Sequence, residues 1–253
     1  MKRIFTKLKE IQSGVKKPKK EEPPVKQAEE QRSMLQSNVA AVPDKVTAPA
    51  ANAPMYKAAT LPAKPLSAEE FTEPRYVRDI KKKIELVFKT EAPISMAMLT
   101  RRVVQSYGIS RAGSRIQGHM NTILQAMNLK TTAQTDAVFC WRADQEPNAY
   151  TLFRVSGEDD HHRDARDVPM QEVANAVCVV LYEQVSMAQE DLLRETAKKL
   201  GYTRLGGNVL TALESGIQYA QSQGNITTGS NGAFILSDSG TARAEVTLGS
   251  FRK

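Results

Sequence analysis

The side chains whose types and spacing could do chemistry are few, and most of them lie in one short stretch. Residues 157–167 read GEDDHHRDARD, a mixture of carboxylates and imidazoles that could in principle bind a metal ion. Adjacent histidines on a connector lack the spacing that turns two rings onto one ion. We therefore predict a solvated linker here, without a metal or a cofactor. The candidate ligands set aside are Glu158, Asp159, Asp160, His161, His162 and Asp164.

Nucleophilic catalysis finds no better support. Cys140 falls in a strand-like stretch and Cys178 in an apolar, helix-like one, where a thiol is ordinarily a packing residue and not a disulfide or a nucleophile. His119 is an isolated helix residue, and no Ser/His/Asp or Cys/His set on a suitable scaffold is evident. The sequence predicts a protein that is not an enzyme.

The charged residues are more informative, because the net charge of +7 is spread unevenly. Cations and acids number eight and one in residues 1–20, five and eight in 21–74, twelve and four in 75–142, and ten and fifteen in 143–253. Only positively charged regions attract polyanions. The charge pattern therefore points to residues 75–142, or to the first twenty, as the part that would bind nucleic acid.

A repeated segment explains why the charge changes along the chain. The sequence YGISRAGSRI around Gly108 returns as GYTRLGGNV around Gly201, an offset of 93 residues. The same offset pairs Ile84 with Val177 and Trp141 with Phe234 without a gap, so we predict one register over about 65 residues. Such a register indicates a duplicated folding unit.

Each unit is expected to contain three helices and a β-hairpin. In the first unit, apolar residues at helical spacing predict a helix over about 75–89. Ser95 can cap a second helix that stops near Gly108, which can adopt the left-handed conformation. Ser110 and Thr203 are suitable N-caps for the third helices.

The third helix of the first unit has two distinct faces. Its apolar residues, Ala112, Ile116, Met120, Ile123, Leu124 and Met127, form a core face. Gly113 and Gly206 are expected on the buried side, where a missing Cβ lets helices pack closely. The opposite face is polar, partly small and basic: Arg111, Ser114, Gly118, Thr122 and Gln125, flanked by Arg115 and His119. Val138, Phe139 and Trp141 then indicate a hairpin, or wing.

The predicted fold is α+β, mainly helical with small β-hairpins, in two tandem winged-helix repeats. A disordered, basic, Pro- and Ala-rich tail is expected over 1–70, the first repeat over 71–155, a linker over 156–168, the second repeat over 169–240 and a C-terminal tail over 241–253. There is no signal-peptide pattern, and the apolar run AVCVVLY is too short to span a bilayer. We expect a cytoplasmic protein.

The segments RRVVQSYGISRAGSRIQGHM and VPMQEVANAV…LGYTRLGGNV resemble the domain of unknown function 3320 family, usually found at the C-terminus of large superfamily 1 helicase proteins. The resemblance covers about residues 75–237. It implies a role near DNA maintenance or defence, but the chain has no helicase motor, no GxxxxGK[ST] and no nuclease signature. The family name therefore supplies no reaction.

Comparison of the repeats gives the functional hypothesis. Cations specific to the first repeat, such as Arg102 and Arg115, become Glu195 and Asn208 in the second. We predict duplex DNA binding by the first repeat, with each cation alternatively an ordinary solvated charge. For Arg111 and its equivalent Arg204 a structural ion pair or helix-end contact is favoured over phosphate binding. The candidate nucleic-acid-binding residues are Lys81, Lys82, Lys83, Arg101, Arg102, Arg111, Arg115, Gln125, Lys130 and Arg142.

A competing hypothesis is a protein–protein adaptor that recruits a helicase or another nucleic-acid enzyme without touching DNA. It rests on the second repeat, whose third helix has a nearly uncharged outer face and whose acids include Glu190, Asp191, Glu195 and Glu214. Residues 1–20 keep three alternatives, because an apolar stripe of Ile4, Phe5, Leu8 and Ile11 lies among lysines. They could bind DNA, an anionic membrane surface or a protein.

Overall fold

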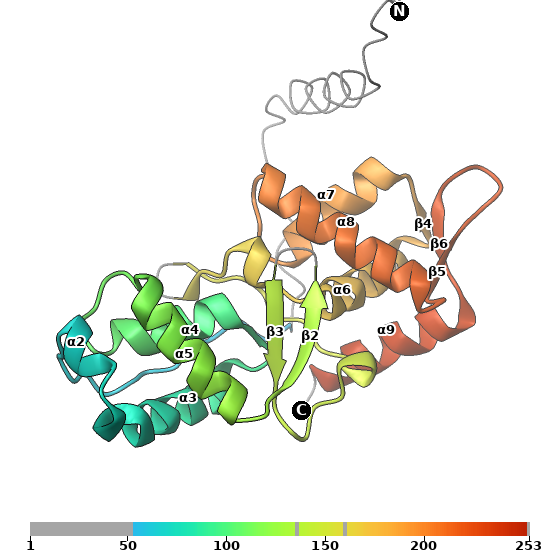
Figure 1. Cartoon of the computed structure of the whole chain (residues 1–253). Coiled ribbons are helices and arrows are strands. Elements are labelled where there is room, and N and C mark those ends of the chain that lie inside the picture. Colours follow the sequence, from blue (N-terminus) through green and yellow to red (C-terminus); the bar gives the residue numbers. More distant parts are fainter. Residues whose placement is uncertain (1–52, 135–136, 159–160, 252–253) are drawn as a thin grey trace, which may run out of the picture. The chain divides into compact units, whose positions relative to one another are not determined.

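The computed structural model describes residues 53–134, 137–158 and 161–251, so the first 52 residues of the disordered tail predicted over 1–70, with the stripe at Ile4–Ile11, lie outside it. Figure 1 shows mainly helices with two small antiparallel sheets. This agrees with the predicted α+β class. A short helix, α2 (Ala68–Phe71), and a 3₁₀ turn (Pro74–Tyr76) lead into the first repeat.

The two repeats contain the same elements in the same order. The first has α3 (Val77–Glu91), β1 (Ile94–Ser95), α4 (Met96–Gln105), α5 (Ser114–Ala126), β2 (Lys130–Gln134) and β3 (Ala137–Trp141). The second has α6 (Met170–Gln184), β4 (Ser186–Met187), α7 (Gln189–Lys199), α8 (Gly207–Ser222), β5 (Ile226–Thr228) and β6 (Phe234–Leu236). The strand orders, β1-β3-β2 and β4-β6-β5, are equivalent. The duplication inferred from the sequence is therefore a duplication of structure.

The common register does not hold to the end of the unit. Ile94 pairs with Cys140, and its equivalent Met187 pairs with Phe234. Phe234 therefore takes the place of Cys140, not of Trp141, and the gap-free alignment is wrong at the hairpin by one residue. This shift is the net result of a third helix longer by three residues (16 in α8, 13 in α5), a connection to the hairpin longer by one, and a hairpin shorter by three, as the pairs Thr131–Cys140 and Thr228–Phe234 show.

Glycines mark the turn between the second and third helices of each repeat. Gly108 and Gly201 have positive φ values of 76° and 88°, as expected for residues that end a helix. Gly113 and Gly206 are the N-caps of α5 and α8, so the predicted caps at Ser110 and Thr203 are wrong.

The packing role predicted for Gly113 and Gly206 is also wrong. Both are exposed, and a Cβ at either would meet no atom within 4 Å. Glycine suits these positions because it is a good N-cap. The glycine that does permit close packing is Gly216 of α8, where a Cβ would lie 2.2 Å from a methyl carbon of Val173 on α6.

Each repeat has its own apolar core. The first is built around Ile80, Ile84, Leu99, Ile116 and Met120, and the second around Val177, Val180, Leu192, Leu213 and Ile217. The core face predicted for the third helix is confirmed at Ile116, Met120, Ile123 and Leu124, which are buried, while Ala112 and Met127 pack partly buried against them.

Three predicted flexible segments are instead packed parts of the fold. Residues 53–66, which we call the strap, run along the first repeat, and Tyr56 in it is only 1% exposed. The proposed linker 156–168 buries Arg163 and Asp167. The proposed C-terminal tail forms α9 (Asp238–Ser250), which buries Ala244 and Thr247 and whose Arg243 donates to Asn175 of α6 (2.7 Å).

A buried ionic cluster joins these segments to both repeats. Glu172, near the start of α6, is fully buried between the guanidiniums of Arg154 and Arg163. Arg154 also donates to the main-chain carbonyls of Glu91 and Pro93 (both 2.7 Å) in the first repeat. Arg154 therefore connects the end of α3 with the beginning of α6.

The carboxylate at the centre of this cluster stays ionised. Burial alone would raise the pKa of Glu172, but Arg154 and Arg163 outweigh burial and lower it to about 2. The ring of Tyr56 lies against both guanidiniums, 5.3 and 4.8 Å from their central carbons. The junction of strap, linker and repeats is thus a buried charge cluster, with one carboxylate between two guanidiniums, and not a flexible hinge.

Replacing Glu172 with glutamine should destabilise the whole unit, because two buried guanidiniums lose their counter-charge. We expect a loss of about 3–5 kcal/mol in urea denaturation at pH 7. Glu183→Gln, which removes an exposed carboxylate paired with Lys199, should cost only about 0–1 kcal/mol. Equal losses would contradict the role of the cluster.

The same variant has an acid signature. A carboxylate with a lowered pKa stabilises the fold above its ordinary pKa of 4.5, and this contribution is lost as the pH falls toward 2. Glu172→Gln should therefore lack part of the wild-type loss of stability below pH 4.5.

Candidate nucleic-acid interface

The outer face of α5 is the most open basic surface of the first repeat. Arg111, Ser114, Arg115, Gly118, Thr122 and Gln125 are all exposed, as the helical wheel predicts. Figure 1 shows α5 in front of the helices on which it packs. Among the described residues, no side-chain hydrogen bond or ion pair is formed by Arg111, Arg115 or Gln125.

The stretch of sequence that contains this face is free of acids. Residues 92–135 contain Arg101, Arg102, Arg111, Arg115 and Lys130 but no aspartate or glutamate. The equivalent stretch of the second repeat, 185–228, has four cations and the four acids Glu190, Asp191, Glu195 and Glu214. The stretch that holds the second and third helices therefore carries a net charge of +5 in the first repeat and of zero in the second.

His119, on the edge of the same face, carries no charge at neutral pH. Its ring packs edge-on against Phe71 with centroids 6.0 Å apart. Burial, and then the neighbouring Arg115, lower the pKa of His119 below its usual value. His119 therefore presents a neutral imidazole beside the two free arginines.

Five of the ten candidate residues are engaged within the fold. Lys83 is buried, donates to the carbonyl of Pro62 in the strap (2.8 Å) and to Ser106 Oγ (2.9 Å), and lies 3.6 Å from the ring centroid of Tyr107. Arg102 pairs with buried Glu91 (3.4 Å). These two are corrections to the predicted site, since both side chains hold the strap and the α3 terminus in place.

The remaining three engaged residues lie near the hairpin and the linker. Lys130 donates to Gln145 O (2.8 Å) and pairs with Glu146 (2.5 Å), and Arg142 forms a two-pronged pair with Asp144 (2.9 and 3.1 Å). Arg101 is half-exposed and reaches Asp167 at 3.9 Å. Local carboxylates thus already neutralise the cations at the base of the hairpin.

The hairpin of the first repeat is itself anchored to the second repeat. Gln134, at the end of β2, accepts a hydrogen bond from the main-chain N–H of Met170 at the start of α6 (2.8 Å). Trp141 is buried on the same hairpin, donates to Thr132 (2.9 Å) and packs edge-on against Tyr150. This hairpin is part of the junction between repeats.

Lys81 and Lys82 lie apart from the α5 face. They are on α3, where Lys82 is exposed and Lys81 half-buried, and neither makes an ion pair within the described residues. The structure therefore separates the candidate residues into a free α5 group, two free lysines on α3 and an engaged group.

Arg111 and Arg204 do not make the structural ion pair favoured from the sequence. Both are exposed, and neither forms a side-chain hydrogen bond or ion pair within residues 53–134, 137–158 and 161–251. Each lies two residues before the N-cap of its third helix. A cation gains nothing from the positive end of a helix dipole, so neither arginine is explained by local stability.

The sequence pattern did not identify the residues that matter most to the junction. No role was predicted for Tyr56, Arg154 or Arg163, and the stretch around His161 and His162 was expected to be solvated. Within the described part of that stretch no cluster could hold a metal ion. A signal was nevertheless present, because Glu172 is the acid of the VPMQEVANAV segment on which the family resemblance rests.

Comparison with known proteins agrees with part of that resemblance. Residues 69–118 match a family model described as Protein of unknown function (DUF3320). This segment belongs to the DUF3320 family. The matched DUF3320 segment includes α3, α4 and the first turn of α5. No curated protein and no solved structure matches the chain.

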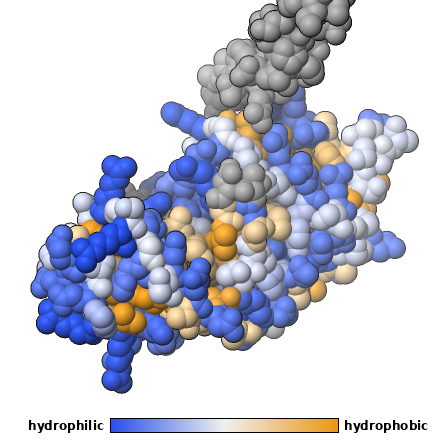
Figure 2. Space-filling view, in the orientation of Figure 1, coloured by the Kyte–Doolittle hydropathy of each residue, from blue (hydrophilic) through white to orange (hydrophobic). Residues whose placement is uncertain are grey.

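Among the described residues, none of the helices has the length and apolar character needed to cross a membrane. The space-filling view shows mostly hydrophilic side chains on the first-repeat side of the molecule, with small apolar areas between them (Figure 2).

Two neighbouring lysines, one buried and one exposed, allow the assignment of engaged and free cations to be tested by mutation. Lys83→Met should lower the free energy of unfolding by about 1–3 kcal/mol, because Pro62 O and Ser106 Oγ lose a donor. Lys82→Met, one position away and exposed, should change it by less than about 0.5 kcal/mol. Urea denaturation measures both, and a Lys83 effect no larger than that of Lys82 would contradict the assignment.

Proposed function

We propose that this protein binds duplex DNA, without catalysing a reaction, through α5 of the first repeat acting as the recognition helix of a winged helix. The observation that carries the proposal is the α5 face itself. It combines two arginines that make no side-chain hydrogen bond or ion pair within the described residues with small polar residues, and residues 92–135 contain no aspartate or glutamate. Stability does not account for this combination.

The chemistry of the face suits a phosphate backbone. Arg111 and Arg115 can each form charge-assisted hydrogen bonds with phosphate oxygens and release condensed counterions. Ser114, Gly118 and Thr122 are small enough to let the helix approach a groove closely. Gln125 is the side chain on this face best suited to a base edge, since an amide can pair with adenine in the major groove.

Outside α5, fewer cations are available to contact DNA than the sequence predicts. Lys81 and Lys82 remain available for flanking phosphates. Arg101 is half-exposed and paired at only 3.9 Å, so it can reorient. Lys83, Arg102, Lys130 and Arg142 support the fold, and the first hairpin is held by α6. The proposal therefore rests on the helix and not on the wing.

A titration of the full-length chain with a short fluorescent duplex across a salt series tests the proposal. Each phosphate contact contributes about 0.9 to the slope of log K against log salt. The double variant Arg111→Gln/Arg115→Gln should therefore bind more weakly, with a slope reduced by about 1.8.

The matched control uses the duplication. Arg111→Gln alone should weaken binding, whereas Arg204→Gln, at the equivalent exposed position of the second repeat, should leave it unchanged. An unchanged slope in the double variant, or equal losses for Arg111→Gln and Arg204→Gln, would contradict binding through α5.

A further inference from the structure

Because the two repeats are equivalent, a site filled in one can be compared with the same site in the other. In the first repeat, the space between the end of α3, β1 and α4 is filled by side chains from outside the repeat. The hydroxyl of Tyr56, from the strap, contacts the Glu91 carboxylate and Met98 Sδ (3.2 Å). Arg154 caps the carbonyls of Glu91 and Pro93. Glu91, Ile94, Ser95 and Met98 are consequently all buried.

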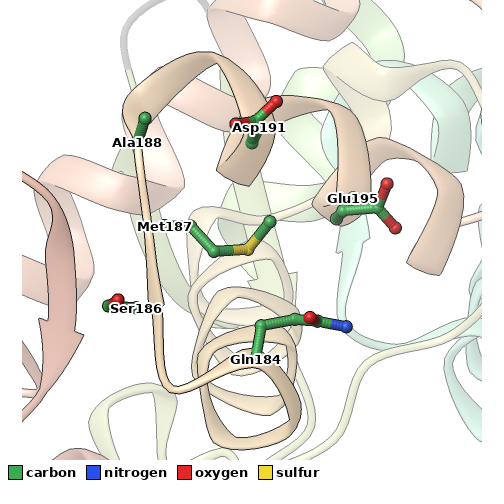
Figure 3. Close-up of a pocket in the computed structure, with 6 residues that line it drawn as sticks. All are labelled: Gln184, Ser186, Met187, Ala188, Asp191 and Glu195. Carbon is green, nitrogen blue, oxygen red and sulfur yellow. The ribbon is translucent and has the colours of Figure 1, made fainter.

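The equivalent space in the second repeat is open. A pocket of about 430 Å³ lies between the end of α6, β4 and α7, lined by Gln184, Ser186, Met187, Ala188, Asp191 and Glu195. In Figure 3 the Met187 side chain lies at its centre, with Gln184 on one side and Asp191 and Glu195 on the other. At the offset of 93, these six residues correspond to Glu91, Pro93, Ile94, Ser95, Met98 and Arg102.

The first-repeat residues at these positions contact segments from outside the repeat. Five of the six first-repeat residues contact the strap, Arg154 or the linker: Glu91, Pro93, Ser95 and Met98 directly, and Arg102 through Glu91. Their second-repeat counterparts Gln184, Ser186, Ala188 and Asp191 are exposed. The pocket therefore has the architecture of a site for an extended segment but receives none from the described part of the chain.

The charge of the pocket indicates what it would accept. Arg102 of the first repeat is replaced by Glu195, Met98 by Asp191 and Glu91 by neutral Gln184. The carbonyl groups at the end of α6 lie at the negative end of a helix dipole. In the first repeat, Arg154 donates to the carbonyl of Glu91, the last residue of α3, and to that of Pro93 beyond it. Asp191 and Glu195 also pair with Arg194 (2.9 Å) and Lys198 (3.0 Å), but these pairs are largely exposed and weak.

We infer that the second repeat binds an extended segment of a partner protein, whose arginine or lysine side chain enters this pocket as Tyr56 and Arg154 enter its equivalent. The cationic group lies between Asp191, Glu195 and the α6 carbonyls, and its aliphatic stem lies against Met187. The inference goes beyond DNA binding and does not depend on it, since α8 and α5 have no residue in the pocket.

The test uses a peptide built on the strap. The probe is an N-acetylated peptide amide with the sequence of residues 54–59 in which arginine replaces tyrosine and glutamine replaces lysine, so that it carries a single cation. It is titrated into the ¹⁵N-labelled full-length chain and followed by two-dimensional NMR. We expect amide shifts concentrated in residues 184–195. The same peptide with citrulline, which has the shape of arginine without its charge, should bind at least tenfold more weakly.

Two variants locate the site. Asp191→Asn/Glu195→Gln should weaken binding of the arginine peptide at least tenfold. Glu190→Gln/Glu214→Gln, which removes two acids of the same repeat outside the pocket, should leave this binding unchanged. Absence of shifts in 184–195, or equal binding by the pocket variant, would overturn the inference. Identical shifts with magnesium chloride alone would reassign the pocket to a metal ion, and tighter binding by a peptide of residues 1–20 would reassign it to this chain's own segment.

Discussion

Glu172 is the residue on which the arrangement of the repeats depends. It accepts hydrogen bonds from two guanidiniums in a position without solvent, and those guanidiniums reach the strap, the linker and the end of α3. Burying a carboxylate is costly unless every lone pair is used. Here the cost is offset only when the strap, linker and both repeats are all in place, so the ion cluster makes their packing cooperative.

This arrangement gives the duplicated units different tasks. The first repeat has its α3–α4 space filled from outside and its hairpin held by α6, which leaves the α5 face as its free surface. The second repeat keeps a nearly uncharged α8 and has the corresponding space open. One fold therefore supports a proposed DNA contact on one helix and a proposed peptide contact at a different place on the other copy.

Local signals in the sequence were sufficient to predict the helices and strands but not the contacts between them. Helical spacing and the glycines at 108 and 201 placed the helices, because these features act within one turn of chain. Helical spacing also predicts that Lys83 is buried, because it lies on the same face of the helix as the core residues Ile80, Ile84 and Val87. Lys81 and Lys82 obscured this prediction, because a run of three lysines is typical of an exposed basic patch.

The strap and linker could not be predicted in the same way. Their composition is that of a disordered segment, and they are ordered by partners far away in the chain: Tyr56 of the strap by Glu91, and Asp167 of the linker by Ser95. Pairings of this kind leave no periodic pattern. The free state of Arg111 and Arg115 was likewise invisible, because only the structure shows which cations have carboxylate partners.

The most direct test of the account is hydrogen–deuterium exchange of the full-length chain with and without a short DNA duplex. Binding through α5 is expected to protect amides in residues 107–126 and to leave the equivalent residues 200–219 unchanged. Protection confined to α8, to residues 1–20 or to no part of the first repeat would contradict the assignment of DNA binding to the α5 face.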